Sequence, residues 1–285
     1  MKRRHTTLLS GLLILLAGCT PQPVSDRPAV TASILPIRFL TEQIAGQDFD
    51  INLLVPPGAS PETYEPTPKQ MQQAAASSML FTTGLIDFEK QMVTDVSKNM
   101  PGLQVVDLSQ GIELIEAEHS HTGHGHAHGT DPHIWTSPHN LKIMAGTLYH
   151  ALSTAYPDST KYTENYQALI ERLDTLDRQL RQLVATGTHH TFIIYHPALA
   201  YLARDYGLTQ IPIEWEGKEP SAEQIRRVVD AARSDRLRRI FYQAQFSQAA
   251  IAAIAREVDA ETVAIDPLAE NVIDNLKQIT QQITE

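Results

Sequence analysis

Residues 159–183 read STKYTENYQALIERLDTLDRQLRQL, and this stretch decides the architecture. Its large apolar side chains recur at alternating spacings of four and three residues, which predicts one helix with a single buried stripe. The stripe consists of Tyr162, Tyr166, Leu169, Leu173, Leu176, Leu180 and Leu183. A helix of this length spans about 37 Å, long enough to join two lobes as a rigid strut. A coiled-coil dimer seam is the competing interpretation, but the stripe lasts only about three heptads and its core is partly Tyr.

Short apolar runs alternate with helix-like segments on both sides of this helix. The expected strands are residues 30–35, 51–55, 79–82 and 104–108 before it, and residues 191–195, 210–213, 239–242 and 262–265 after it. The expected helices are residues 39–46, 68–77 and 88–98 before it, and residues 198–206, 221–233, 247–257 and 272–280 after it. Such alternation is typical of parallel sheets with crossover helices. We therefore expect an α/β fold of two lobes with parallel-sheet βα repeats, joined by one long rigid helix.

The amino terminus resembles a bacterial lipoprotein signal. Three basic residues precede a short apolar run at residues 8–16, and Leu16-Ala17-Gly18 leads directly to Cys19. The run is too short to span a bilayer comfortably, so we expect cleavage ahead of a lipid-modified cysteine. Residues 1–19 are then the signal with lipidated Cys19, and the Pro-rich residues 20–28 are a tether. This predicts export to the cell envelope and a lipid anchor on the periplasmic or extracellular face of a bacterial membrane.

The rest of the chain divides at the long helix. We expect an N-terminal α/β lobe over residues 29–157, a linking helix over 158–184 and a C-terminal α/β lobe over 185–285. The N-terminal lobe includes a His-rich loop at residues 118–130. No later segment reaches the roughly 18 uninterrupted apolar residues of a transmembrane helix. The body is therefore expected to be soluble and only tethered to the membrane.

Charge and cysteine content exclude several functions. The formal net charge is −10, and cleavage of the signal removes three basic residues and no acidic ones. An acidic chain without a basic stripe does not suit a phosphate backbone, so we expect no nucleic-acid partner. Cys19 is the only cysteine of the chain. Internal disulfides, thiolate metal sites and cysteine nucleophiles are therefore excluded from the folded part.

A dense histidine tract points to a metal. Residues 119–133 read HSHTGHGHAHGTDPH and hold six of the twelve histidines. Neutral imidazole binds zinc, copper and nickel well, and the small residues between the histidines leave a flexible strip. His133 differs from the others because it follows Asp131-Pro132 at the edge of ordered structure. The others are expected to be auxiliary metal ligands: His119, His121, His124, His126 and His128.

Four metal-binding groups lie in separate loops at matching places of the two lobes. Open parallel sheets bind ligands beyond the carboxyl ends of their strands, which is where these loops begin. The groups are Glu62 or Glu65 in the turn-rich loop 56–68, His133, His196 after strand 191–195, and Asp266 after strand 262–265. Two imidazoles and two carboxylates make a four-group cage for a divalent ion without any cysteine.

Several segments in order carry a family resemblance. They are residues 58–68, Asp131-Pro132-His133-Ile134-Trp135, Tyr195-His196-Pro197-Ala198 with Tyr201, Glu219-Pro220-Ser221, Gln245-Phe246-Ser247 and Asp266-Pro267-Leu268. With them the chain resembles the metal-binding solute-binding lipoproteins of bacterial ABC importers for zinc and manganese, over nearly the whole mature sequence. The resemblance implies two α/β lobes joined by a long rigid helix, with one metal in the cleft between them. It also implies a monomer without enzyme activity that serves an ABC permease membrane subunit and its ATPase.

The resemblance assigns the metal ligands with one departure from the family pattern. Glu62 stands where the family usually places its first histidine, so the implied set is Glu62, His133, His196 and Asp266. A three-ligand site completed by water is the alternative. Gln243 stands where relatives often carry an acidic residue, and it is not counted as a ligand.

The groups of this cage suit zinc and also accept manganese or ferrous iron. The histidine tract favours zinc, because imidazole clusters prefer zinc to manganese and such tracts accompany zinc uptake in the family. We therefore expect extracytoplasmic capture of Zn²⁺ for import, with Mn²⁺ or ferrous iron as the alternative cargo. An adhesin or zinc-storage lipoprotein and a metallohydrolase are the rival functions from other classes.

Overall fold

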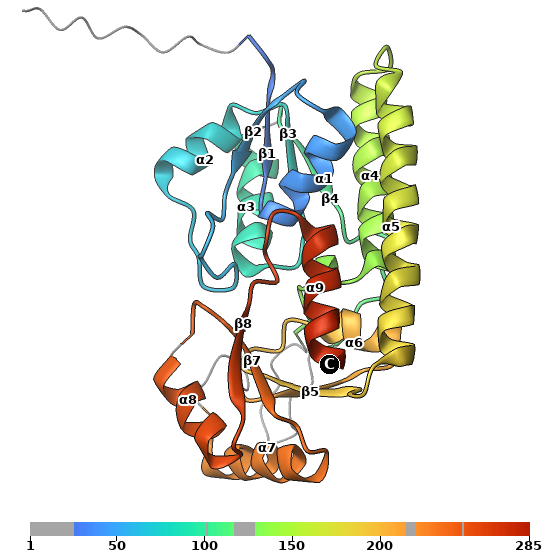
Figure 1. The fold of residues 1–285 in the computed structure, drawn as a ribbon. Coiled ribbons are helices and arrows are strands. Elements are labelled where there is room, and N and C mark those ends of the chain that lie inside the picture. Colours follow the sequence, from blue (N-terminus) through green and yellow to red (C-terminus); the bar gives the residue numbers. More distant parts are fainter. Residues whose placement is uncertain (1–25, 101, 117–128, 215–219, 247) are drawn as a thin grey trace, which may run out of the picture.

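The computed structural model describes residues 26–100, 102–116, 129–214, 220–246 and 248–285. Figure 1 shows two α/β lobes stacked end to end beside a pair of long helices. The expected fold class is therefore confirmed. Several expectations lie outside the described residues: the signal with Cys19, most of the tether, and the auxiliary histidines His119, His121, His124, His126 and His128.

Each lobe contains a parallel four-stranded sheet. The first has the order β2-β1-β3-β4 and the second the order β6-β5-β7-β8. The strands of the first sheet are β1 (Ala29–Ala32), β2 (Asp50–Leu53), β3 (Met79–Thr82) and β4 (Gln104–Asp107). Those of the second are β5 (Thr191–Ile194), β6 (Thr209–Pro212), β7 (Arg239–Gln243) and β8 (Glu261–Ile265). Every strand expected from the sequence is present, and its ends agree to within three residues.

Helices connect successive strands as crossover connections require. In the first lobe they are α1 (Leu35–Ala45), α2 (Pro68–Ala75) and α3 (Asp87–Asn99). In the second they are α6 (Ala200–Tyr206), α7 (Ala222–Ser234) and α8 (Gln248–Glu257), and α9 (Val272–Thr284) follows the last strand. In both lobes the loops at the carboxyl ends of the strands face the junction between the lobes (Figure 1).

The long linking helix is α5 (Lys161–Thr186). Its buried side chains are Tyr162, Leu169, Leu173, Leu176, Leu180 and Val184, so the predicted stripe holds except at Tyr166, which is only partly buried, and at its last position. There Val184 is buried and Leu183 only partly so. The stripe packs within the molecule against α1, α9 and a further helix, α4 (Pro138–Ala155). A coiled-coil seam would need this same face, so that interpretation is wrong.

Among the described residues, α4 is the one long element that the sequence pattern did not predict. Ser137 caps it by accepting a hydrogen bond from Asn140 N at 3.2 Å, and Pro138 occupies the first helical position. Its buried face includes Leu141, Met144, Ala145, Leu148 and Leu152. A short 3₁₀ turn, η1 (Ile134–Thr136), precedes it. Figure 1 shows α4 alongside the upper part of α5, so a helical hairpin rather than a single helix supports the first lobe.

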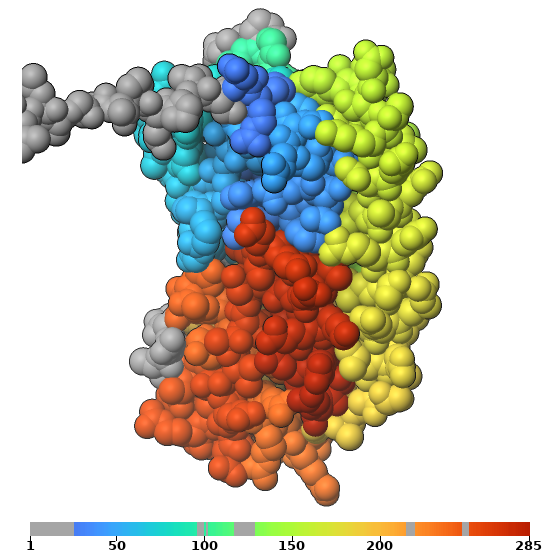
Figure 2. Space-filling model, turned by 45° about the horizontal axis from the view of Figure 1, so that its top comes forward, coloured from blue at the N-terminus to red at the C-terminus, as the bar shows by residue number. Residues whose placement is uncertain are grey.

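The main hydrophobic core is continuous between the lobes. It joins Leu40 and Phe81 of the first lobe to Leu173 of α5 and to Phe192 and Leu276 of the second lobe. Separate smaller cores lie on the outer faces of both sheets. In Figure 2 the α4–α5 pair runs along one side of both lobes, with the C-terminal segment beside it. Both lobes are therefore anchored to one rigid framework.

No helix in the described part of the chain is both long and apolar enough to cross a membrane.

Candidate metal centre

The loop that carries Glu62 connects β2 to α2 and is held at both ends by one glutamine. Gln70 Nε2 donates to Leu54 O at 2.6 Å, where the loop begins. Gln70 Oε1 accepts hydrogen bonds from Tyr64 Oη at 2.8 Å and from Thr67 N at 2.9 Å, where the loop ends. Thr67 and Gln70 also form a capping box for α2. This local network fixes the path of the loop and presents Glu62 to the other lobe.

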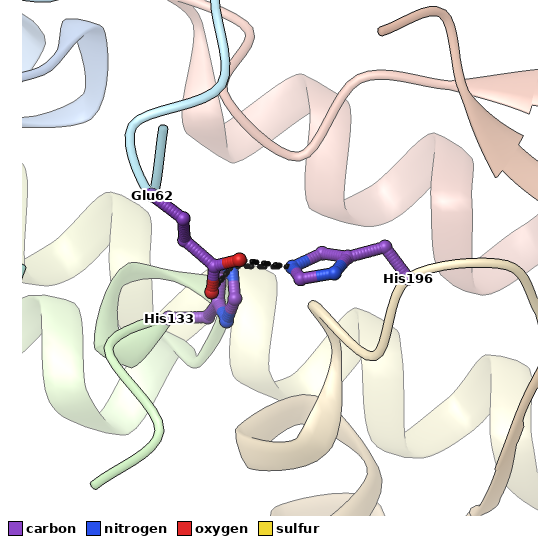
Figure 3. Close-up of side chains that lie close together, drawn as sticks. All are labelled: Glu62, His133 and His196. Atoms are coloured by element: carbon purple, nitrogen blue, oxygen red, sulfur yellow. Dashed lines mark hydrogen bonds and ion pairs between the residues drawn. The ribbon is translucent and has the colours of Figure 1, made fainter. Parts of the chain in front are cut away.

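Glu62, His133 and His196 converge between the lobes, as Figure 3 shows. One ligand atom from each lies within 4.8 Å of the other two. His196 Nε2 is 3.3 Å from Glu62 Oε2 and 3.4 Å from His133 Nε2, and His133 Nε2 is 3.8 Å from Glu62 Oε1. His133 is only 5% exposed and His196 8%, whereas the Glu62 side chain is 34% exposed. The cluster is thus buried on its histidine side and open to solvent beside Glu62.

A carboxylate orients each imidazole from behind. Asp131 Oδ1 lies 2.8 Å from His133 Nδ1, and Glu214 Oε2 lies 3.2 Å from His196 Nδ1. A carboxylate accepts a hydrogen bond from Nδ1–H, which leaves Nε2 of each ring as the metal-binding atom. The two Nε2 atoms face each other and Glu62. Each imidazole therefore lies between a carboxylate at its Nδ1 and the Glu62 carboxylate near its Nε2.

Charges in the site favour a cation. Burial lowers the pKa of His196, but the hydrogen bonds and charges of Glu214 and Glu62 outweigh it and raise the pKa to about 9. For Glu62, burial raises the pKa, and the neighbouring imidazoles of His196 and His133 bring it below its ordinary value. The metal-free site thus holds His196 as an imidazolium beside carboxylates. A metal ion would take the place of that proton.

Asp266, the fourth predicted ligand, lies outside this three-residue cluster. It borders the same pocket as His133 and His196, but it is exposed. Its Oδ1 accepts a hydrogen bond from Leu268 N at 3.0 Å, and its carbonyl accepts one from Asn275 Nδ2 at 2.8 Å. Glu65, the other carboxylate considered in the loop before α2, does not belong to the cluster either.

Two further residues contact His196: Glu214, which the sequence did not indicate, and Gln243, which was noted but not counted as a ligand. Glu214 lies two residues after the end of β6 and is 4% exposed. Gln243 ends β7, and its Nε2 donates to His196 O at 3.0 Å. Both stand at the carboxyl edge of the sheet that also presents His196 and Asp266. Their positions near strand ends were the one available signal, and many ordinary polar residues share it.

This fold, with a buried histidine–carboxylate cluster between two parallel α/β lobes, defines a metal-binding protein of the two-lobe class. The chain belongs to the family described as zinc-uptake complex component A, periplasmic, whose model matches residues 30–285.

Relatives agree with this assignment. The chain is 31% identical over 281 residues to a putative metal-binding protein of Chlamydia trachomatis, covering 94% of this chain and 96% of the relative. It is 27% identical over 278 residues to the zinc-binding lipoprotein AdcA of Streptococcus pneumoniae R6, covering 94% of this chain. It spans only 56% of the length of that relative. A crystal structure of ZnuA superposes with a TM-score of 0.83 at 35% identity, covering 91% of this chain and 98% of the other.

Proposed function

We propose that this protein captures Zn²⁺ outside the cytoplasm and delivers it to an ABC permease with its ATPase for import. The observation that carries the proposal is the convergence of Glu62, His133 and His196 between the lobes. Family membership and the zinc-binding names of several relatives support the choice of cargo.

The spacing of the three groups fits zinc. A tetrahedral zinc with bonds of about 2.0–2.1 Å holds its ligand atoms roughly 3.3–3.4 Å apart. The separations from His196 Nε2 to Glu62 and to His133 are 3.3 and 3.4 Å. Two imidazole nitrogens also favour zinc over manganese, which prefers oxygen ligands. The third separation, 3.8 Å from His133 Nε2, is to the other oxygen of Glu62, so the exposed carboxylate has to turn to offer one oxygen to the ion.

Asp266 is our proposed fourth ligand. Its Oδ1 is engaged with Leu268 N, and the second oxygen of the carboxylate remains for the ion. Asp266→Asn then lowers zinc affinity, as Glu62→Gln does. If water completes the site instead, Asp266→Asn binds zinc like the unaltered protein. Titration of both variants against a zinc chelator distinguishes the two ligand sets.

Export, anchoring and assembly state are part of the proposal. We place the protein on a bacterial membrane through lipid on Cys19, which the lipoprotein name of a relative supports. We take it to act as a monomer, because its long apolar helix stripe is covered by its own chain. Mass spectrometry of membrane-derived protein checks the modification of Cys19, and sedimentation checks the monomer.

We assign the five histidines between His119 and His128 an auxiliary role in collecting zinc. Deleting residues 118–129 separates this role from storage. An importer component keeps one tight zinc site after the deletion. A storage protein loses most of its bound zinc.

Native mass spectrometry with zinc and manganese offered together tests the proposed function. We expect one tightly bound zinc that is lost when His133 and His196 are both replaced by alanine. Removal of zinc should also lower the melting temperature, since zinc at about 100 times its Kd adds roughly 2.7 kcal/mol of stability. Preferential manganese binding, or zinc retained by the double variant, would overturn the proposal.

A further inference from the structure

Tyr201 lies where the two lobes meet behind the metal centre. It belongs to α6 of the second lobe, which follows the His196 segment. The side chain is fully buried, and its ring carries the Arg204 guanidinium 5.1 Å from the ring centroid. The hydroxyl group therefore has protein partners instead of water, and those partners belong to the first lobe.

The Tyr201 hydroxyl links two backbone segments. It donates to Asp131 O at 2.9 Å and accepts from Ile115 N at 3.2 Å. Burial raises the pKa of Tyr201 to about 12, so the hydroxyl keeps the proton that it donates. The same two segments also join each other directly, because Asp131 N donates to Ile115 O at 2.9 Å.

Asp131 carries this connection to the metal centre. Its Oδ1 accepts from His133 N and also lies 2.8 Å from His133 Nδ1. The Tyr201 hydroxyl thus holds, through one residue, the segment that sets the position of His133. On the other side, the turn from His196 into α6 is fixed by Ala198 N donating to His196 O at 2.8 Å. One phenol therefore joins the supports of two imidazoles that come from different lobes.

We propose that Tyr201 is a positioning residue that fixes the spacing between His133 and His196 across the lobe junction and thereby sets how tightly zinc is held. The inference rests on the proposed function. It adds the contact that keeps His133 and His196 at a fixed separation. Loss of an outer partner of a metal ligand costs roughly 10–100-fold in affinity. Because Tyr201 acts one residue further out, we expect the lower end of this range.

Tyr201→Phe tests the inference, with Tyr206→Phe as its matched control. Both tyrosines lie on α6 and both substitutions remove one buried hydroxyl. Tyr206 Oη, however, donates to Asp177 Oδ1 of α5 at 2.8 Å, away from the metal centre. The measurements are zinc Kd by chelator competition, zinc dissociation rate, the visible spectrum of the cobalt-loaded protein and melting of the metal-free protein.

We expect Tyr201→Phe to bind zinc about 10-fold more weakly, to release it faster and to alter the cobalt spectrum. Tyr206→Phe should match the unaltered protein in all three, although both variants melt somewhat earlier without metal. Arg204→Met, which removes the hydrogen bond to Glu113 O at 2.7 Å beside the same link, should weaken zinc binding to a smaller extent.

Two results would overturn the inference while leaving the proposed function standing. Either Tyr201→Phe binds zinc as the unaltered protein does, or Tyr206→Phe loses as much affinity, which would reduce Tyr201 to a role in stability. Absence of zinc binding by the unaltered protein would overturn the proposed function, and the inference with it.

Discussion

At the scale of single residues, the metal centre depends on two carboxylates that lie behind the imidazoles of His133 and His196. Asp131 and Glu214 each hold an Nδ1 atom, and so each imidazole presents Nε2 to the site. A negative partner also makes the imidazole a stronger ligand, because it stabilises the positive charge shared with the metal. Zinc affinity should therefore depend on these two residues as well as on the ligands.

Glu214→Gln should weaken zinc binding by roughly 10–100-fold. Glutamine keeps the size of the side chain and an oxygen acceptor for His196 Nδ1, but it removes the charge. Chelator competition at pH 7 measures the effect. Glu223→Gln, at an exposed position of α7, is the control and should leave affinity unchanged. Equal affinities for the two variants would show that the charge behind His196 has no part in binding.

How far the site could be predicted from sequence depended on the residue. His133 was predicted because it follows Asp131-Pro132, and His196 because it follows the strand at residues 191–195. Glu62 was predicted because it lies in the turn-rich loop 56–68. Glu214 was not, because a single carboxylate after a strand is ordinary until the fold brings it behind an imidazole. Asp266 was predicted on the same strand-end logic; it borders the pocket without belonging to the three-residue cluster, and its role as a ligand stays a prediction.

At the scale of secondary-structure elements, the contact between α5 and α6 centres on Asp177. The carboxylate accepts from Arg181 Nε at 3.0 Å on its own helix and from Tyr206 Oη at 2.8 Å on α6. Burial raises the pKa of Asp177, but the hydrogen bonds from Arg181 and Tyr206 bring it below its ordinary value. The charged carboxylate thus helps to hold α6 against the linking helix.

The acid stability of the protein should depend on Asp177. Because its pKa is lower in the folded than in the unfolded chain, its stabilisation is complete above the unfolded value of about 4. That stabilisation is lost as pH falls through the folded value. Asp177→Asn should therefore be less stable at pH 7, and the gap should narrow below about pH 4. Urea unfolding at pH 7, 4 and 3 measures it, and a gap that is constant with pH contradicts the assignment.

Element prediction succeeded where a pattern was short and self-contained. Four-residue apolar runs between turn residues identified the strands, and the stripe at spacings of four and three identified α5. Helix α4 was not predicted, although Ser137-Pro138 is a good helix start signal. The helix follows the His-rich loop, and it does not alternate with a strand as the other helices do. Its partner surface on α5 exists only in the folded molecule.

At the scale of the whole molecule, α5 and the shared core make the two lobes one framework. Leu173 and Phe192 belong to the same buried cluster, and Trp135 Nε1 of the first lobe donates to Pro267 O of the second at 3.0 Å. A hinge would have to break these contacts. Capture of the ion should therefore involve local side-chain movement instead of wide closure of the lobes.

Small-angle X-ray scattering of the metal-free and zinc-loaded protein tests this rigidity. We expect the two scattering curves to superpose, with the same radius of gyration. A clearly smaller radius in the zinc-loaded protein would indicate hinge closure and would contradict the strut role of α5.

The central claim is that Glu62, His133 and His196 together hold one zinc ion between the lobes. Crystals of the zinc-loaded protein, with diffraction recorded above and below the zinc absorption edge, test it most directly. The account predicts one strong anomalous peak about 2.0–2.2 Å from both Nε2 atoms and from a Glu62 oxygen. A zinc ion bound away from these three side chains would contradict it.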